Sequence, residues 1–393
     1  MKSISIIPRK NLGRIIRKAI QDPIFAYNSF RRRFLSFLTY KFADGYSAFP
    51  ETISLFLTRR CNLKCGMCGQ WGERGVFRNY SPEVLKQQLE LPTIKKLLRE
   101  CKPYRPTITL FGGEPMLHPD WLGIVRAAKE NGLRCNIVTN AVLLHQHVNE
   151  IVDSGLDEII FSLDGPREVH DSSRGVPGTF DRAMEGFERL RQIKEQRGQQ
   201  KPFVTINTTI NQYNHHCLTE IAEIAERIGA YHLNLHHLLF LSQGTCERHD
   251  KFFRQRFGVP SPDWFGFVHD TLPALDLEVL FREMDKIRQR QSGVSVSFYP
   301  NFEEDEIRKY YTEWEFESKS YANRCLSPWM VAYIFPDGSV RPYHSMSYEP
   351  GNVLTESFAK IWNNPQYREY RRVVKEIGKF EVCSKGCTEL YRY

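Results

Sequence analysis

The sequence predicts an α/β fold built from parallel βα units, and two patterns lead to that prediction. Six short apolar segments with the composition of strands recur between residues 52 and 240, and segments of helical periodicity fill the gaps between them. Strands that alternate with helices in this way pair in parallel. Because ligands bind at the carboxyl ends of parallel strands, the residues that follow each strand are the candidates for function.

The order of these elements divides the chain into four parts. We expect an N-terminal basic helical arm over residues 1–48, a βα core over 49–241, a mostly helical linker or insertion over 242–320, and a small α+β domain over 321–393. The predicted core strands are 52–57, 107–111, 134–138, 158–162, 203–210 and 232–240. The predicted core helices are 81–100, 119–131, 145–154, 179–197 and 217–228. In the last part, a β-hairpin is predicted around Pro336-Asp337-Gly338.

Composition excludes several classes of protein. The 393 residues are 41% hydrophobic and 25% charged, as in an ordinary globular protein. No apolar run approaches the roughly 20 residues that a membrane span needs, and no secretory signal is visible. The ten cysteines are therefore interpreted as reduced thiols, and we expect a cytoplasmic protein.

The net charge of +8 is concentrated in residues 1–45, which hold ten basic and two acidic residues. Two amphipathic helical segments, separated by Asp22-Pro23, carry these charges among apolar and aromatic residues. Three interpretations remain open: the arm packs on the body of the protein, contacts an anionic membrane surface, or contacts nucleic acid. The second would place the protein at the inner face of the membrane; specific nucleic-acid binding is not expected.

Three cysteines, Cys61, Cys65 and Cys68, follow the first strand with the spacing C-x3-C-x2-C. A loop of this length can fold three thiolates onto one face of an iron–sulfur cube and leave one iron open to a small molecule. The alternative is structural zinc. Zinc sites usually combine C-x2-C pairs with a second pair of ligands, and no fourth ligand follows Cys68.

This loop resembles the cluster loop of the radical S-adenosylmethionine (SAM) enzymes, and the resemblance extends over roughly residues 50–240. It implies an open, partial (β/α)6 barrel in which the three cysteines hold a [4Fe–4S] cluster. In that family the open iron binds SAM, and the reduced cluster cleaves SAM to methionine and a 5′-deoxyadenosyl radical. An electron donor such as flavodoxin or ferredoxin would be a partner.

The same resemblance implies SAM contacts at the ends of successive strands. Phe111-Gly112-Gly113-Glu114-Pro115 matches the family's motif for the SAM amino group, which gives that role to Gly112, Gly113 and Glu114. The other implied contacts are Met67 against the adenine, Asn140 near the ribose or sulfonium, Ser162 and Asp164 on the ribose hydroxyls, and Asn207 on the adenosine.

Arg174 and two histidines leave alternatives open. Arg174 could bind the SAM carboxylate through a two-pronged contact, or it could form a surface ion pair with Asp171. His232 and His236 share one face of the sixth strand by its period of two. We expect them either to point into the barrel toward a polar substrate or to satisfy hydrogen bonds in the core.

The C-terminal region resembles the SPASM or Twitch extension of the family, which binds auxiliary iron–sulfur clusters. Cys325, Cys383 and Cys387 are too few for a two-cluster set, so at most one auxiliary cluster is expected. Where the family has a cysteine after the hairpin glycine, this chain has Tyr343 and then His344. Either His344 is the fourth ligand, or an open iron binds substrate, or no cluster forms; three cysteines and a histidine would also suit zinc.

The resemblance implies an enzyme whose radical abstracts hydrogen from a peptide, a protein or a small natural-product precursor. The outcome would be oxidation, cross-linking or epimerisation. A lipid-linked or sugar substrate at a membrane surface is the alternative. Cys246, just after the sixth strand, is either a hydrogen-atom donor to the substrate radical or an ordinary loop cysteine. A non-enzymatic iron–sulfur electron carrier and a zinc-binding protein are the rivals from other classes.

Overall fold

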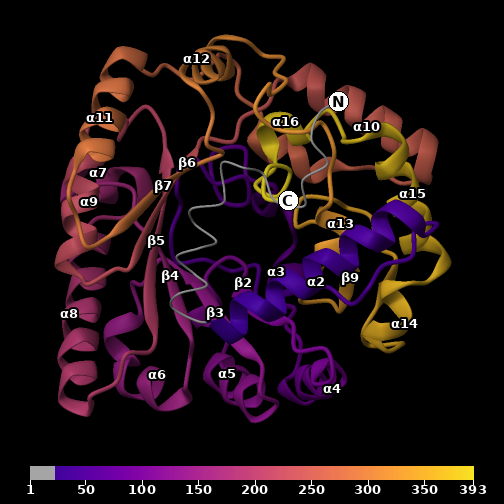
Figure 1. Ribbon diagram of the computed structural model, residues 1–393, viewed down its shortest axis with the longest axis horizontal. Coiled ribbons are helices and arrows are strands. Elements are labelled where there is room, and N and C mark those ends of the chain that lie inside the picture. The colour runs from indigo at the N-terminus through magenta and orange to yellow at the C-terminus, as the bar shows by residue number, and fades with distance from the viewer. Residues whose placement is uncertain (1–22) are drawn as a thin grey trace.

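The computed structural model describes residues 23–393 and contains a curved ten-stranded sheet (Figure 1). The strands lie in the order β10-β9-β8-β1-β2-β3-β4-β5-β6-β7, and those from β8 to β7 are parallel. Their bounds are β1 (Thr52–Phe56), β2 (Thr107–Phe111), β3 (Arg134–Thr139), β4 (Glu158–Ser162), β5 (Phe203–Ile210), β6 (His232–His237), β7 (Ser295–Tyr299), β8 (Val331–Ile334), β9 (Ser339–Arg341) and β10 (Gly351–Asn352). The sheet is not closed into a full barrel, because β7 and β10 are its two ends.

The prediction of an α/β fold with a parallel sheet and an open barrel is confirmed. All six core strands form at the predicted places, and helices cover the outer face of the sheet (Figure 1). These helices are α4 (Leu91–Cys101), α5 (Trp121–Glu130), α6 (Val148–Ser154), α8 (Thr179–Arg197) and α9 (Leu218–Arg227). The helix predicted over 81–100 is split into α3 (Pro82–Lys86) and α4, because Pro92 stands in the first turn of α4 and cannot continue a helix.

The pleat of the strands separates the core from the interior of the barrel. In β2, Ile108 and Leu110 are fully buried toward the outer helices, whereas Thr107, Thr109 and Phe111 line the central cavity. Each helix that covers the sheet buries apolar residues on the side facing it. In α4, the buried residues at helical spacing are Ile94, Leu97, Leu98 and Cys101.

The region between residues 242 and 320 adds to the sheet as well as linking two parts of the chain. Its helices are α10 (Gln243–Phe257), α11 (Leu277–Gln289) and α12 (Glu304–Thr312), with a short 3-10 helix η5 (Pro262–Phe267). Between α11 and α12, β7 pairs in parallel with β6. The insertion therefore extends the barrel wall by one strand.

The C-terminal region joins the other side of the same sheet. The predicted hairpin forms as β8 and β9, and β8 pairs in parallel with β1, with Thr52 opposite Val331. Four helices complete the region: α13 (Ser327–Met330), α14 (Phe358–Trp362), α15 (Pro365–Ile377) and α16 (Cys383–Gly386). The hairpin consequently stands beside the strand that leads into the three-cysteine loop.

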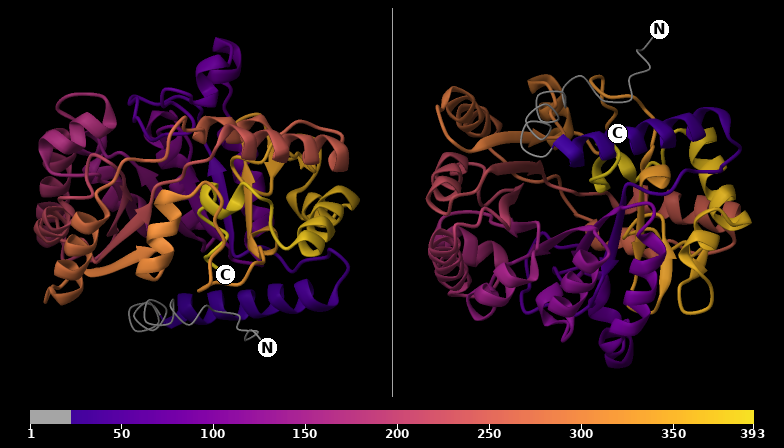
Figure 2. Two further views of the ribbon diagram at one scale, coloured as in Figure 1. Left: turned by 90° about the horizontal axis from the view of Figure 1, so that it is seen from above. Right: turned by 60° about the horizontal axis from the view of Figure 1, so that its bottom comes forward.

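Helix α2 (Pro23–Phe42) lies along one side of the body (Figure 2). Arg33 pairs with Glu51 at 2.9 Å just before β1, and Phe37 is buried. These contacts agree with an arm that packs on the body. The first amphipathic segment of the arm lies outside the described residues. Within residues 23–393, no helix combines the length and the apolar character that crossing a bilayer requires.

Candidate active site

The loop from Cys61 to Cys68 leaves the carboxyl end of β1 and presents three sulfur atoms. An N–H group points at each of them: Leu63 N–H at Cys61 (3.5 Å), a guanidinium N–H of Arg174 at Cys65 (3.6 Å), and Trp71 N–H at Cys68 (3.4 Å). Thiolate sulfur accepts hydrogen bonds, and such bonds tune the potential of a cluster bound to it. The loop is therefore built around three thiolates.

The donor set fits an iron–sulfur cube better than a single ion. Burial raises the pKa of Cys61 to about 12 and also raises that of Cys65, so the thiolates need a cationic partner such as iron. Among residues 23–393, no three side chains of His, Cys, Asp or Glu converge closely enough to hold one metal ion. Zinc requires such convergence, whereas a cube takes each thiolate on a different iron.

The Gly-Gly-Glu motif packs directly on the segment that leads into this loop. Gly113 N–H donates to the carbonyl of Thr58 (2.8 Å), and Glu114 N–H donates to the carbonyl of Arg60 (2.9 Å). A Cβ at Gly113 would lie 2.1 Å from the oxygen of Arg60. Gly112 has φ of +142°, and a Cβ there would lie 2.7 Å from the oxygen of Thr58. Both glycines are required by this close approach of two strand ends.

Glu114 joins the ends of β2 and β3. Its buried carboxylate accepts from Thr139 Oγ1 (2.8 Å), Asn140 N–H (2.9 Å) and Met116 N–H (3.1 Å), and burial raises its pKa to about 7. Asn140 then donates through Nδ2 to Oδ1 of Asn62, inside the cysteine loop (2.8 Å). Two predicted SAM contacts from different strands are thus assembled beside the three sulfurs.

Arg174 closes the other side of the loop. Its guanidinium pairs with buried Asp164 at 2.7 Å and donates to the carbonyl of Ser162 at 2.8 Å. The alternative of an ion pair with Asp171 is wrong, because Asp171 instead accepts three hydrogen bonds at the start of α8, from Gly178 N–H, Thr179 Oγ1 and Phe180 N–H. The structure therefore gathers Ser162, Asp164 and Arg174 next to Cys65.

The barrel encloses a cavity of about 340 Å³, lined by inward-facing side chains of β1 to β8 and of the C-terminal residues. Asn207 lines it, and its Oδ1 accepts from Asn234 Nδ2 at 3.0 Å. His232 and His236 line the cavity too, which is the first of the two alternatives left open for them, and His232 Nε2 lies 2.8 Å from Asn234 Oδ1. A ladder of amides and imidazoles thus forms one wall.

Sequence reasoning missed the charged residues near the amino-terminal ends of the strands. Arg134 pairs with Glu158 at 3.0 Å, and the same carboxylate accepts from Tyr231 (2.7 Å) and Thr205 (2.6 Å). Arg134 and Glu158 are the first residues of β3 and β4, and all four residues lie away from the carboxyl ends that were searched for function. The period-two pattern of the strands is the signal that could have found them, because each faces the interior.

The cysteines near the C-terminus also come together. Cys325, Cys383 and Cys387 line one apolar pocket, where Tyr343 also lies and Glu389 N–H points at the sulfur of Cys387 (3.3 Å). His344 does not line this pocket. It lines the central cavity, with Nδ1 2.8 Å from Ser345 Oγ and its ring 5.6 Å from that of Phe111. The geometry puts Tyr343 beside the three thiols and does not support His344 as their fourth ligand.

Two further predicted residues have clear positions. Cys246 lies in the first turn of α10 and not in a loop; its side chain is fully buried, and its thiol is 3.6 Å from the carbonyl of Trp264. It is not among the residues that line the central cavity, so this geometry does not favour it as a hydrogen donor there. Met67 is half-buried and packs against the small apolar cluster of Leu63 and Val142 beneath the cysteine loop.

Known families match the two parts of the chain that contain the cysteine sites. The sequence model of the radical SAM superfamily matches residues 55–225, and that of the SPASM iron–sulfur cluster-binding domain matches residues 325–388. The chain therefore contains a radical SAM domain, followed by a SPASM domain in its C-terminal region. It is accordingly an enzyme whose cofactors are SAM and iron–sulfur clusters.

Individual relatives differ in what they are named for. The chain is 28% identical to the AdoMet-dependent heme synthase of Methanosarcina barkeri, over 85% of this chain and 88% of the relative. It is 24% identical to the sporulation killing factor maturation protein SkfB of Bacillus subtilis, over 86% and 71%. Among solved structures, SuiB of Streptococcus suis bound to its precursor peptide SuiA has a TM-score of 0.60 at 15% identity, over 88% of this chain and 72% of that chain. That structural likeness supports the fold.

Proposed function

We propose that this enzyme binds a small molecule, or one side chain of a peptide, in its central cavity and abstracts a hydrogen atom from it. The observation that carries the proposal is the cavity of about 340 Å³, whose lining combines the wall of the barrel with the C-terminal domain. That volume is at the small end of the range for ligand pockets. It suits a compact substrate or a peptide side chain and is too small for a folded protein.

In this proposal, Cys61, Cys65 and Cys68 hold the [4Fe–4S] cluster, and the polar ends of β2 to β5 hold SAM. The bound cofactors supply the 5′-deoxyadenosyl radical. The chain's own residues orient SAM through the motif of Gly112 and Glu114. Arg174 and the N–H groups around the loop hold charge on the sulfurs. A ferredoxin or flavodoxin supplies the electron.

Two substrate classes compete, and each has its own support. A peptide is favoured by the likeness in fold to a peptide-bound structure and by the relative named for maturation of a killing factor. A heme precursor is favoured by the relatives named heme synthases, which align over most of this chain. The cavity has room for one side chain of such a macrocycle and not for the whole ring. The cavity offers both a hydrogen-bonding wall of amides and an aromatic wall with Tyr299, Tyr333 and His344.

The experiment uses the anaerobically reconstituted enzyme with SAM and dithionite. Iron-coproporphyrin III and a peptide library are offered separately, each in protonated and deuterated form. Substrate-dependent 5′-deoxyadenosine that carries deuterium identifies the class. If SAM is cleaved and neither class transfers deuterium, both substrate assignments are wrong. If SAM is not cleaved at all, the proposed role of the cysteine loop fails.

We also propose that α2 brings the enzyme to an anionic membrane surface. Its outward side exposes Tyr27 (67%), Phe30 (53%), Phe34 (42%) and Phe42 (81%), although the helix is anchored by Arg33 and Phe37. Residues 1–45 carry the whole positive excess of the chain. Exposed aromatics with basic residues suit the interface of an anionic bilayer, and such contact would favour a lipid-linked substrate.

Deleting the whole arm would remove buried contacts of α2, so a sharper test substitutes its exposed side chains. Phe30→Ser/Phe34→Ser should reduce sedimentation with phosphatidylserine vesicles by tenfold or more, and salt should weaken binding of the unchanged protein. Tyr213→Ser is the matched control, since Tyr213 is 50% exposed elsewhere on the molecule. If all three proteins sediment equally with the vesicles, or if none of them does, the membrane proposal is wrong.

A further inference from the structure

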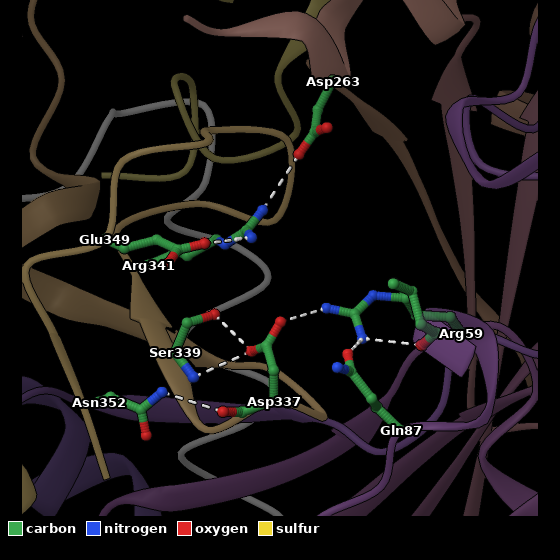
Figure 3. Close-up of polar contacts among 9 residues, drawn as sticks. Arg59, Gln87, Asp263, Asp337, Ser339, Arg341, Glu349 and Asn352 are labelled. Atoms are coloured by element: carbon green, nitrogen blue, oxygen red, sulfur yellow. Dashed lines mark hydrogen bonds and ion pairs between the residues drawn. The ribbon is translucent and has the colours of Figure 1, made fainter. Parts of the chain in front are cut away.

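A buried arginine lies two residues before the first cysteine of the loop. Only 3% of the Arg59 side chain is exposed. Its guanidinium lies 2.5 Å from Asp337 Oδ2 and donates to Gln87 Oε1 (2.9 Å) and to the carbonyl of Val84 (3.3 Å) (Figure 3). Asp337 is the turn residue of the β8–β9 hairpin. The pair therefore links the C-terminal domain to the entrance of the cysteine loop.

The link continues from Arg59 to a sulfur atom. The backbone carbonyl of Arg59 accepts the indole N–H of Trp71 at 2.7 Å. The backbone N–H of Trp71 in turn points at the sulfur of Cys68 at 3.4 Å. Three successive contacts thus join the carboxylate of Asp337 to one of the three thiols.

Both partners of the Arg59–Asp337 pair make further contacts that hold them in place. Asp337 Oδ1 accepts from the N–H (3.0 Å) and the hydroxyl (2.7 Å) of Ser339, and its carbonyl accepts from Asn352 Nδ2 (2.9 Å). These bonds hold its other carboxylate oxygen toward Arg59 (Figure 3). Arg59 also stands near the rings of Tyr80 and Phe335. A displacement of the hairpin would consequently move Arg59 rather than be absorbed by a loose side chain.

A second buried pair braces the same hairpin. Arg341 of β9 lies 3.2 Å from Asp263 of η5 and 2.5 Å from Glu349 (Figure 3). Its guanidinium also covers the ring of Phe335. Phe335 stacks on Phe56 of β1, with ring centres 4.8 Å apart. The hairpin is therefore fixed to the insertion on one side and to β1 on the other.

We propose that the Arg59–Asp337 pair is a positioning device, through which docking of the C-terminal domain sets the geometry of the three-cysteine loop. Arg59 acts through Trp71 on Cys68 and touches no reacting atom. Correct SAM binding at the three-cysteine loop then requires that the C-terminal domain is docked in place. This requirement is separate from any cluster that the C-terminal domain itself binds. The inference rests on the proposed role of this loop in holding the SAM-binding cluster.

The test uses full-length protein, anaerobically reconstituted, with Arg59→Gln, Asp337→Asn, the double variant and Trp71→Phe. Trp71→Phe keeps a ring but removes the indole N–H, so it breaks the middle of the link and leaves the ion pair in place. Arg74→Gln is the matched control: Arg74 lies on the same stretch of chain, and its pair with Asp270 is exposed on both sides. SAM affinity is measured from the change in the electron paramagnetic resonance spectrum of the reduced cluster, and the melting temperature is recorded for each protein.

We expect Arg59→Gln, Asp337→Asn and Trp71→Phe each to weaken SAM binding by tenfold or more and to alter the spectrum of the SAM complex. The double variant should be no worse than Arg59→Gln, and Arg74→Gln should match the unchanged protein. If Arg59→Gln does not fold, Asp337→Asn and Trp71→Phe still test the inference. Unchanged affinity and spectra in folded variants, with only a lower melting temperature, would overturn the inference. An unchanged protein that shows no SAM-dependent spectrum would instead overturn the proposed function.

Discussion

At the scale of single residues, the site depends on the N–H groups that point at the sulfur atoms of Cys61, Cys65 and Cys68. Arg174 has the most consequential position, because one guanidinium serves Cys65, Asp164 and the carbonyl of Ser162. A buried cation beside a thiolate stabilises the charge of the thiolate. Arg174 also holds the carboxylate of Asp164, which follows the carboxyl end of β4. In the proposed site, substitution of Arg174 therefore affects the cluster and the SAM pocket together.

Arg174→Gln is expected to lower cluster retention by about 10- to 100-fold, the usual effect of removing a hydrogen-bond partner of a metal ligand. Iron content after desalting against a chelator measures this. Arg167→Gln is the control, since Arg167 is exposed and pairs with exposed Asp181 on the surface of the same region. Iron retention equal to that of the control would contradict the role given to Arg174.

At the scale of elements, the hairpin turn has a strict backbone requirement. Gly338 has φ of +83°, and a Cβ there would lie 2.4 Å from Asn352 Oδ1. Gly338→Ala is expected to destabilise the protein by about 1–3 kcal/mol through strain in the left-handed region. Gly293→Ala is the matched control, because nothing lies within 4 Å of its added methyl group. Urea denaturation compares the two, and equal stabilities would show that the turn relaxes freely.

The start of α12 gives a pH dependence. The carboxylate of Glu306 accepts hydrogen bonds from Ser318 Oγ and from the backbone N–H groups of Lys319, Ser320 and the N-cap residue Glu303. Burial alone would raise the pKa of Glu306, but these hydrogen bonds lower it to about 2. A lowered folded-state pKa contributes stability above pH 4.5 that is lost as pH falls toward 2. Glu306→Gln should cost about 2–3 kcal/mol at pH 7 in urea denaturation of the apoprotein. The difference in unfolding free energy between the two proteins should shrink between pH 4.5 and pH 3. A difference that stays constant with pH would contradict this prediction.

The sequence predicted the core strands well because each combines apolar composition with a turn on either side. It could not predict that β8 would pair with β1, since 274 residues separate the end of one from the start of the other and strand pairing is not a local property. The side-chain directions of Tyr343 and His344 were equally out of reach. They depend on how the segment after β9 folds back over the barrel.

At the scale of the whole molecule, one curved sheet connects the part of the chain with the three-cysteine loop to the C-terminal part with the second cysteine pocket. The strand that leads into the three-cysteine loop is hydrogen-bonded to the strand that opens the hairpin of the C-terminal domain. The cavity is lined by both parts of the chain. The proposed substrate cavity, the proposed SAM site and the second cysteine pocket are thus parts of one continuous structure.

The central claim is that the loop of Cys61, Cys65 and Cys68 holds the cluster that cleaves SAM. The most direct test measures iron and sulfide after anaerobic reconstitution, together with SAM cleavage, in the unchanged protein and in the variant with all three cysteines replaced by alanine. We predict about eight irons per chain, falling to about four in a variant that no longer cleaves SAM. Undiminished iron and undiminished SAM cleavage in the variant would contradict the claim.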